Sequence, residues 1–98
     1  MIAFKNEKSV PINFTGVCKI LDVNCVCHYL NRKLHREDGH AVEYVYITDI
    51  YYNNKFIPCI KAWYYKNTVY GLDNDFNINS WKEKVEELKR EDELRIFL

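Results

Sequence analysis

Short runs of hydrophobic residues fill most of the chain, and turn-forming residues separate them. The runs are rich in β-branched and aromatic residues, which favour strands, and they cover residues 17–21, 25–30, 41–50 and 56–65. Asn, Asp and Gly tolerate or require the backbone of tight hairpins. They supply the expected turns Asp22-Val23-Asn24, Asn31-Arg32, Asp38-Gly39, Asn53-Asn54, Lys66-Asn67 and Asp73-Asn74. The pattern predicts an antiparallel meander over residues 1–78.

Two of the runs differ in how their hydrophobic residues alternate. In residues 25–30 the odd-numbered positions, Cys25, Cys27 and Tyr29, share one face. Residues 41–50 are hydrophobic on both faces, with Val42, Tyr44, Tyr46 and Ile50 on one and Val45 and Ile47 on the other. This second pattern is typical of a central strand covered on both sides. The C-terminal helix is the candidate element to pack on the second face of this strand.

Residues 80–96 have the pattern of that helix. Ser80 and Glu83 have the spacing of a capping box, in which each side chain binds a free backbone N–H of the first turn. A single stripe at helical spacing carries Trp81, Val85, Leu88 and Ile96. The charged run 82–95 is either a docking surface or, as we expect, an ordinary solvated face. Phe97 marks either the helix end or an exposed anchor.

Length and charge exclude several classes of function. The chain has 98 residues, enough for one domain with a single core, and 14 basic residues balance 14 acidic ones. A net charge of zero argues against a protein that tracks nucleic-acid phosphates. The sequence has no run of about eighteen apolar residues, the length that a membrane-spanning helix needs. Residues 1–10 do not resemble a secretory signal. We therefore expect a cytoplasmic protein with four reduced cysteines, while disulfides stay possible if a leader was removed.

An internal repeat relates residues 28–43 to residues 63–78 at an offset of 35. Both segments contain an aromatic start, a polar two-residue turn, a short apolar strand and an Asp-Gly or Asp-Asn turn. The aligned pairs include Tyr29 with Tyr64, Leu34 with Val69, His35 with Tyr70, and Asp38 with Asp73. Two such units would bury, by stacking, a face that neither could bury alone.

The first copy also resembles a known group of repeats. Residues 29–43, YLNRKLHREDGHAVE, resemble the W-Y-x-N-G-K-x-H-R-E-D-G-P-A repeats of small bacteriophage and mobile-element proteins. The resemblance covers about a third of the chain and implies a fold of β-hairpins and a viral context. It offers no established catalytic residue to transfer to this chain, and we expect no cofactor. Arg32 replaces the glycine of the repeat's turn, His40 replaces its proline, and the second copy lacks the His-Arg-Glu triplet.

The polar run from His35 to His40 permits two interpretations. In a hydrolase or nuclease, His35 would be a general base oriented by Asp38. In a scaffold, His35 bonds backbone across the repeat, Arg36 pairs with a neighbouring carboxylate, and Asp38-Gly39 closes a turn. The scaffold interpretation is favoured for two reasons. The His-Arg-Glu triplet is part of the repeat consensus, as packing residues are, and the sequence has no second cluster of catalytic groups to complete a mechanism.

A zinc site is the remaining candidate for chemistry. It would take Cys25 and Cys27 from one strand face and His35 and His40 from the next hairpin. We expect the two sulfur atoms of Cys-x-Cys to stand roughly 7 Å apart on a strand, too far for easy chelation. Buried reduced thiols in a β core are the favoured alternative.

The eight tyrosines point to binding. Because adjacent residues of a strand face opposite ways, the doublets Tyr51-Tyr52 and Tyr64-Tyr65 should each expose one ring. Exposed tyrosines suit protein interfaces, and they can also stack single-stranded bases, although only a few lysines lie nearby. We expect exposed tyrosines and the tips of the Asn31-Arg32 and Asn53-Asn54 hairpins to meet the partner. The expected contacts are Arg32, Tyr51, Tyr52, Lys55 and Tyr65.

These observations predict a single α+β domain, an antiparallel meander of hairpin repeats with one C-terminal helix packed on the sheet. The expected function is non-enzymatic protein binding. The implied phage context narrows this to an accessory protein that sterically blocks a host or defence-system protein, such as an anti-CRISPR inhibitor of a CRISPR-Cas nuclease. A single-strand nucleic-acid binder and a small hydrolase centred on His35 and Asp38 are the alternatives, and a homodimer through a sheet edge is possible.

Overall fold

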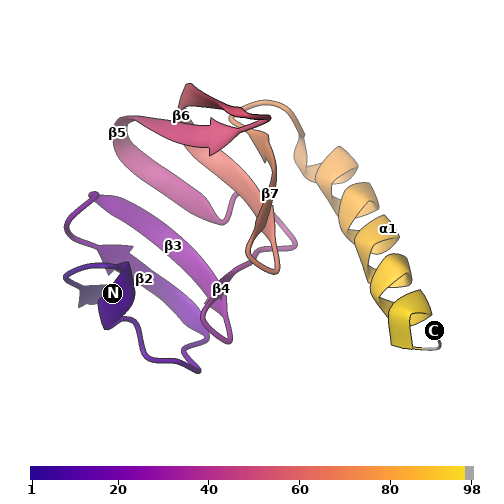
Figure 1. Cartoon of the computed structure of the whole chain (residues 1–98), viewed down its shortest axis with the longest axis horizontal. Coiled ribbons are helices and arrows are strands. Elements are labelled where there is room, and N and C mark those ends of the chain that lie inside the picture. Colours follow the sequence, from indigo (N-terminus) through magenta and orange to yellow (C-terminus); the bar gives the residue numbers. More distant parts are fainter. Residues whose placement is uncertain (97–98) are drawn as a thin grey trace.

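The fold is α+β, as predicted: a seven-stranded, mostly antiparallel sheet with one long C-terminal helix (Figure 1). The computed structural model describes residues 1–96. The strands are β1 (Ile2–Phe4), β2 (Gly16–Ile20), β3 (Cys25–Leu30), β4 (Lys33–Leu34), β5 (Val42–Tyr52), β6 (Lys55–Tyr65) and β7 (Thr68–Leu72). The helices are the short 3-10 helix η1 (Glu7–Ser9) and α1 (Ile78–Ile96).

The strand order is β1-β2-β3-β5-β6-β7, which is a meander with two departures. β1 pairs with β2 in parallel, whereas the other pairs are antiparallel. β3 is shared: Cys25–Cys27 pair with β5, and Tyr29–Leu30 pair with the two-residue strand β4. At the end of β3, Tyr29 therefore has β4 on one side in place of β5, while it stays paired with Gly16 of β2 on the other.

Three hairpins close through two-residue turns in which both residues have a left-handed backbone. The φ values are 50° and 61° at Asn31-Arg32, 54° and 65° at Asn53-Asn54, and 45° and 72° at Lys66-Asn67. These are the values of a type I′ turn, whose twist matches that of the flanking strands. Arg32 adopts this conformation without the glycine of the resembling repeats, at a cost on the order of 1 kcal/mol.

The expected Asp38-Gly39 turn differs from these hairpins. Neither residue has a positive φ, and both lie in the irregular loop between β4 and β5. A Cβ atom on Gly39 would stand 2.9 Å from Cζ of Arg36. The glycine is thus needed for the close approach of a guanidinium group, not for a left-handed turn.

Two hydrophobic clusters lie on opposite faces of the sheet. The larger one fills the concave side of the curved sheet and contains the inward residues of β2, β3, β5, β6 and β7. The predicted alternation in β3 is confirmed, because Cys25, Cys27 and Tyr29 are all buried. The smaller cluster joins α1 to β6 and β7 through Trp63, Tyr65, Trp81, Val85 and Leu88.

The helix begins earlier than predicted. Its first turn is capped by Asn77, whose Oδ1 accepts from the Ser80 N–H at 2.8 Å, while the Ser80 Oγ accepts from the Asn77 N–H at 3.0 Å. The predicted capping box of Ser80 and Glu83 is therefore wrong, because Asn77 already binds these groups. The side chain of Ile96 and the whole of Phe97 lie outside the described residues.

The middle of β5 is exposed, so the prediction that both its faces are covered is wrong. The pairing with β6 shifts between Glu43, opposite Lys61, and Thr48, opposite Cys59. Residues 44–47 thus face the single residue Ile60, and three of them are exposed: Val45 at 57%, Tyr46 at 72% and Ile47 at 70%. The helix covers β6 and β7 instead and leaves this bulge open to solvent.

Candidate functional site

His35 joins the β3–β4 hairpin to the β6–β7 hairpin. Its Nδ1 accepts the backbone N–H of Lys66 at 3.0 Å, which leaves the ring proton on Nε2. Nε2 then donates to Oε2 of Glu37 at 2.9 Å, and the ring packs against Tyr65 at a centroid distance of 4.8 Å. Both ring nitrogens of this buried histidine are occupied, and neither contacts Asp38. The pairing of His35 with Asp38 that the hydrolase alternative required is absent from this geometry.

Arg36 holds the loop after β4 together. Its Nε donates to Oδ1 of Asp38 at 2.9 Å, and its Nη1 donates to the His40 carbonyl at 3.2 Å and to Nε2 of His28 at 3.2 Å. The guanidinium group lowers the pKa of the Asp38 carboxyl, and burial together with Arg36 lowers the pKa of His28. The Arg36 carbonyl accepts the indole N–H of Trp81 at 2.8 Å, which ties the loop to α1.

His40 and Trp63 share one acceptor. His40 Nε2 donates to the Asp73 carbonyl at 2.7 Å, and Trp63 Nε1 donates to the same oxygen at 2.9 Å. Their rings lie 3.7 Å apart, and Oδ1 of Asp73 accepts the backbone N–H groups of Ile60 and Lys61. Asp73 thus anchors the second repeat to the first.

The two hairpins of the internal repeat have the same pairing. Tyr29 lies opposite Leu34 in one, and Tyr64 lies opposite Val69 in the other. Leu34 exchanges two hydrogen bonds with Asn67, donating its N–H to Oδ1 at 3.2 Å and accepting the Asn67 N–H at 2.8 Å. The polar residues of the first repeat therefore serve contacts between the hairpins, and they do not converge on an open site.

The four candidate zinc ligands are not brought together. Cys25 and Cys27 lie in the concave core with their sulfur atoms 3.5 Å apart, closer than the expected 7 Å because the two side chains lean toward each other. Their thiol contact and burial raise the pKa of Cys27. His35 and His40 instead bond Glu37, Lys66 and Asp73. Within residues 1–96, no group of three or more His, Cys, Asp or Glu residues is arranged to hold a metal ion.

The expected partner contacts separate into exposed and covered residues. Arg32, Tyr51 and Lys55 are exposed. Tyr52 is half-buried and donates its hydroxyl to the Tyr70 carbonyl at 3.0 Å. Tyr65 is only 5% exposed, so its nomination as a contact is wrong.

Tyr65 is covered because α1 packs on one face of β6 while the concave core covers the other, so the Tyr64-Tyr65 doublet exposes neither ring fully. Its hydroxyl donates to Oδ2 of Asp92 at 3.0 Å. Burial and this hydrogen bond raise the pKa of Tyr65 to about 12. The residue therefore fastens the helix to the sheet.

The long β5–β6 hairpin carries an exposed apolar surface, which we call the outer hairpin face. Tyr51 and Phe56 are opposite each other on the two strands, with rings 5.2 Å apart, and they are 59% and 69% exposed. Val45, Tyr46 and Ile47 of the bulge and Ile60 of β6 are also exposed on this hairpin, and the name includes them. Sequence reasoning missed five of these six residues. The signal was present as the two-sided apolar pattern of residues 41–50, which has only one helix available to cover it.

Comparison with known proteins gives no relative: no family model, no curated protein and no solved structure matches the chain. The resemblance of residues 29–43 to phage repeats therefore stays a prediction. Among residues 1–96, no helix is both long and apolar enough to cross a membrane.

Proposed function

We propose that the protein is a non-enzymatic protein-binding module and that the outer hairpin face is its contact surface. The observation that carries the proposal is the exposure of three aromatic rings, Tyr46, Tyr51 and Phe56, on one hairpin. An aromatic side chain has about 150–250 Å² of surface, so rings exposed by 59–72% present roughly 400 Å² together. The largest apolar patch on a typical monomer is about 300–600 Å² and is often functional.

The neighbouring aliphatic residues enlarge this area toward that of a standard interface. Val45, Ile47 and Ile60 are 57%, 70% and 44% exposed. A stable protein complex buries about 800 Å² on each partner, which the six side chains and their surroundings can supply. The turn Asn53-Asn54 ends the hairpin, and Lys55 beside it adds a polar edge of the kind that surrounds an apolar contact.

The charges near the outer hairpin face favour protein over nucleic acid as the partner. The exposed charged residues of β5 and β6 are Asp49, Lys55 and Lys61. Two lysines beside one aspartate do not form the basic groove that follows a phosphate backbone. Base stacking on Tyr51 and Phe56 is the alternative that the experiment below distinguishes.

The resemblance to phage repeats suggests which class of protein the partner belongs to. A small phage or mobile-element protein that binds through a rigid hairpin would act by occupying a surface of a host protein. We propose a defence nuclease, such as a CRISPR-Cas effector, as the partner and steric blocking as the mechanism. This narrower statement rests on the resemblance alone, whereas the binding surface rests on the exposed aromatic residues.

Affinity capture with matched variants tests the proposal. The tagged protein, the double variant Tyr51→Ala/Phe56→Ala and the control Ile12→Ala/Leu94→Ala are each used to capture partners from a bacterial lysate treated with nuclease. The control removes apolar side chains that are 81% and 64% exposed at positions outside β5 and β6. Circular dichroism checks that each variant is folded.

The proposal predicts a stoichiometric protein partner that the unmodified protein and the control capture and the double variant does not. Loss of one interface hot spot costs about 2–4 kcal/mol, so the affinity of the double variant should fall at least thirtyfold. Capture of nucleic acid alone, in an amount that falls steeply with salt, would instead support base stacking. Equal capture by the double variant would remove the outer hairpin face from the interface.

A further inference from the structure

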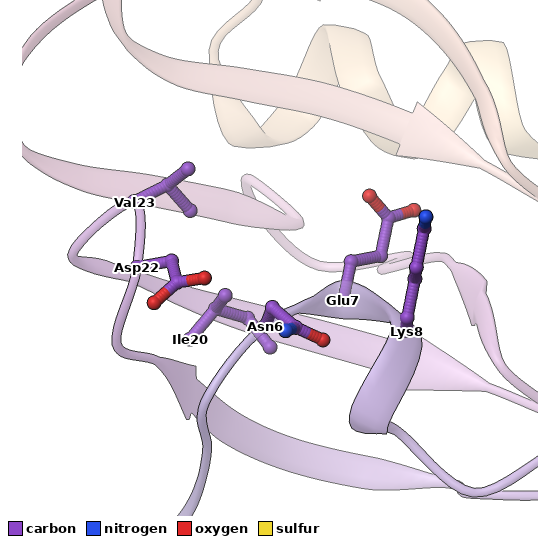
Figure 2. A pocket seen from close by; sticks show the side chains of 6 residues that line it. All are labelled: Asn6, Glu7, Lys8, Ile20, Asp22 and Val23. Carbon is purple, nitrogen blue, oxygen red and sulfur yellow. The ribbon is translucent and has the colours of Figure 1, made fainter.

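A cavity system opens on the concave side of the sheet, away from the outer hairpin face. Its outer part, of about 370 Å³, is lined by residues of η1, β2 and the turn after β2. Figure 2 shows these six side chains, with Glu7 and Lys8 extending from η1 and Asp22 and Val23 from the turn.

An inner cavity of about 290 Å³ adjoins the outer one and reaches the large hydrophobic cluster. The two share Glu7, Ile20 and Val23 as lining residues. Their volumes fall in or just below the usual range for small-molecule sites, about 300–1,000 Å³. A ligand in these cavities would have its polar end at η1 and its apolar body against the hydrophobic cluster on the concave side of the sheet.

The inner walls combine aliphatic side chains with two aromatic rings. Ile20, Val42 and Leu34 provide the apolar surface, and Tyr29 and Tyr44 also line the space. Burial raises the pKa of both tyrosines, so their hydroxyl groups stay neutral and can accept a hydrogen bond. These walls therefore suit the hydrocarbon body of a ligand.

The rim of the cavity system is acidic. The acids Glu7, Asp22 and Asp49 line the two parts, against a single base, Lys8. Within residues 1–96, neither the Glu7 nor the Asp22 carboxylate makes a side-chain hydrogen bond or an ion pair. Glu7 lines the inner cavity as well as the outer one. A positive charge is the chemistry that such a rim would attract.

We propose that this cavity system binds a small organic ammonium ion, with the ammonium group held by Glu7 and the apolar body among Ile20, Val42, Tyr29 and Tyr44. An ammonium group has three N–H donors and no acceptor, which matches the carboxylate oxygens of Glu7 and Asp22 at the rim. A carboxylate ligand would be repelled by the acidic rim, and a neutral alcohol would lose the charge-assisted hydrogen bond. The site does not depend on the proposed protein-binding function.

A nuclear magnetic resonance titration of the full chain tests this site with three matched probes: hexylamine, hexanol and hexanoate. At pH 7 hexylamine carries the positive charge, hexanol none and hexanoate a negative one. Amide shifts are followed at Val23, Cys25 and Thr48, which line the cavities. The titration is repeated with Glu7→Gln and with the control Glu83→Gln, an exposed acid on α1.

The expected result is a saturable shift with hexylamine at these amides, at least about tenfold weaker binding of hexanol, and no saturable shift with hexanoate. Glu7→Gln should weaken hexylamine binding at least about tenfold, and Glu83→Gln should leave it unchanged. Both acids are exposed, so neither variant should lose its fold, and the amide spectrum shows this directly. Equal affinity for hexylamine and hexanol, unchanged binding by Glu7→Gln, or the absence of saturation would each overturn the proposal.

Discussion

Replacement of Trp81 by Phe tests how the helix is attached to the loop of the first repeat. Trp81 is fully buried, its indole N–H donates to the Arg36 carbonyl at 2.8 Å, and its ring lies 5.1 Å from Phe76 and 5.4 Å from Trp63. Phenylalanine keeps an aromatic ring at this position but cannot donate. An orphaned buried acceptor costs about 1–3 kcal/mol, and the smaller ring loses roughly 1 kcal/mol of apolar burial.

Together these effects predict that Trp81→Phe lowers the free energy of unfolding by about 2–4 kcal/mol. A domain of this size has only about 5–15 kcal/mol of stability, so the melting temperature should fall by roughly 10 °C or more. Urea unfolding followed by circular dichroism measures the change, with the m-value unchanged. The control Ile78→Ala, at a side chain that is 54% exposed, should change stability by less than about 0.5 kcal/mol. A loss below about 0.5 kcal/mol in Trp81→Phe would refute the attachment described above.

Three further predictions concern local features. Arg32→Gly should raise the free energy of unfolding by about 0.5–1 kcal/mol in urea titrations, because φ is 61° at this position; destabilisation would contradict the type I′ turn. Burial and Arg36 lower the pKa of His28 in the folded protein. The stability that neutral His28 contributes is therefore fully present above its unfolded pKa of about 6.5, and it is lost as the pH drops through the folded pKa. Proton magnetic resonance should therefore give His28 a pKa below 6.5, and a higher one would be inconsistent with its contact to Arg36. All four cysteines are buried and free, so a thiol reagent should react slowly with them until urea unfolds the chain; rapid reaction of the folded protein would show that the core is open.

The features that could be predicted from the sequence are those that depend on neighbouring residues. Alternation in residues 25–30 gave the buried face of β3, because successive side chains of a strand point to opposite sides. The stripe of Trp81, Val85 and Leu88 gave the face of α1 that packs on the sheet. Asn-containing pairs such as Asn53-Asn54 gave the hairpin turns, because these side chains tolerate positive φ.

The features that were missed depend on contacts between distant parts of the chain. The bulge in β5 is held by a hydrogen bond from the Val45 N–H to the Asn24 carbonyl at 3.0 Å, which no local pattern encodes. The burial of Tyr65 follows from where α1 lies, and α1 is placed by Trp81 and its bond to Arg36. The outer hairpin face is exposed because the single helix packs on β6 and β7 and leaves the bulge of β5 uncovered, and this placement depends on contacts distant in the sequence.

Photo-crosslinking from position 51 tests the central claim most directly. Tyr51 is replaced by p-benzoyl-phenylalanine in the full chain, and Leu94, which is 64% exposed on α1, is replaced in the same way as the control. After irradiation in a bacterial lysate, the account predicts a covalent adduct between position 51 and one protein, with no such adduct from position 94. Equal labelling from both positions, or adducts with nucleic acid only, would contradict a protein-binding outer hairpin face.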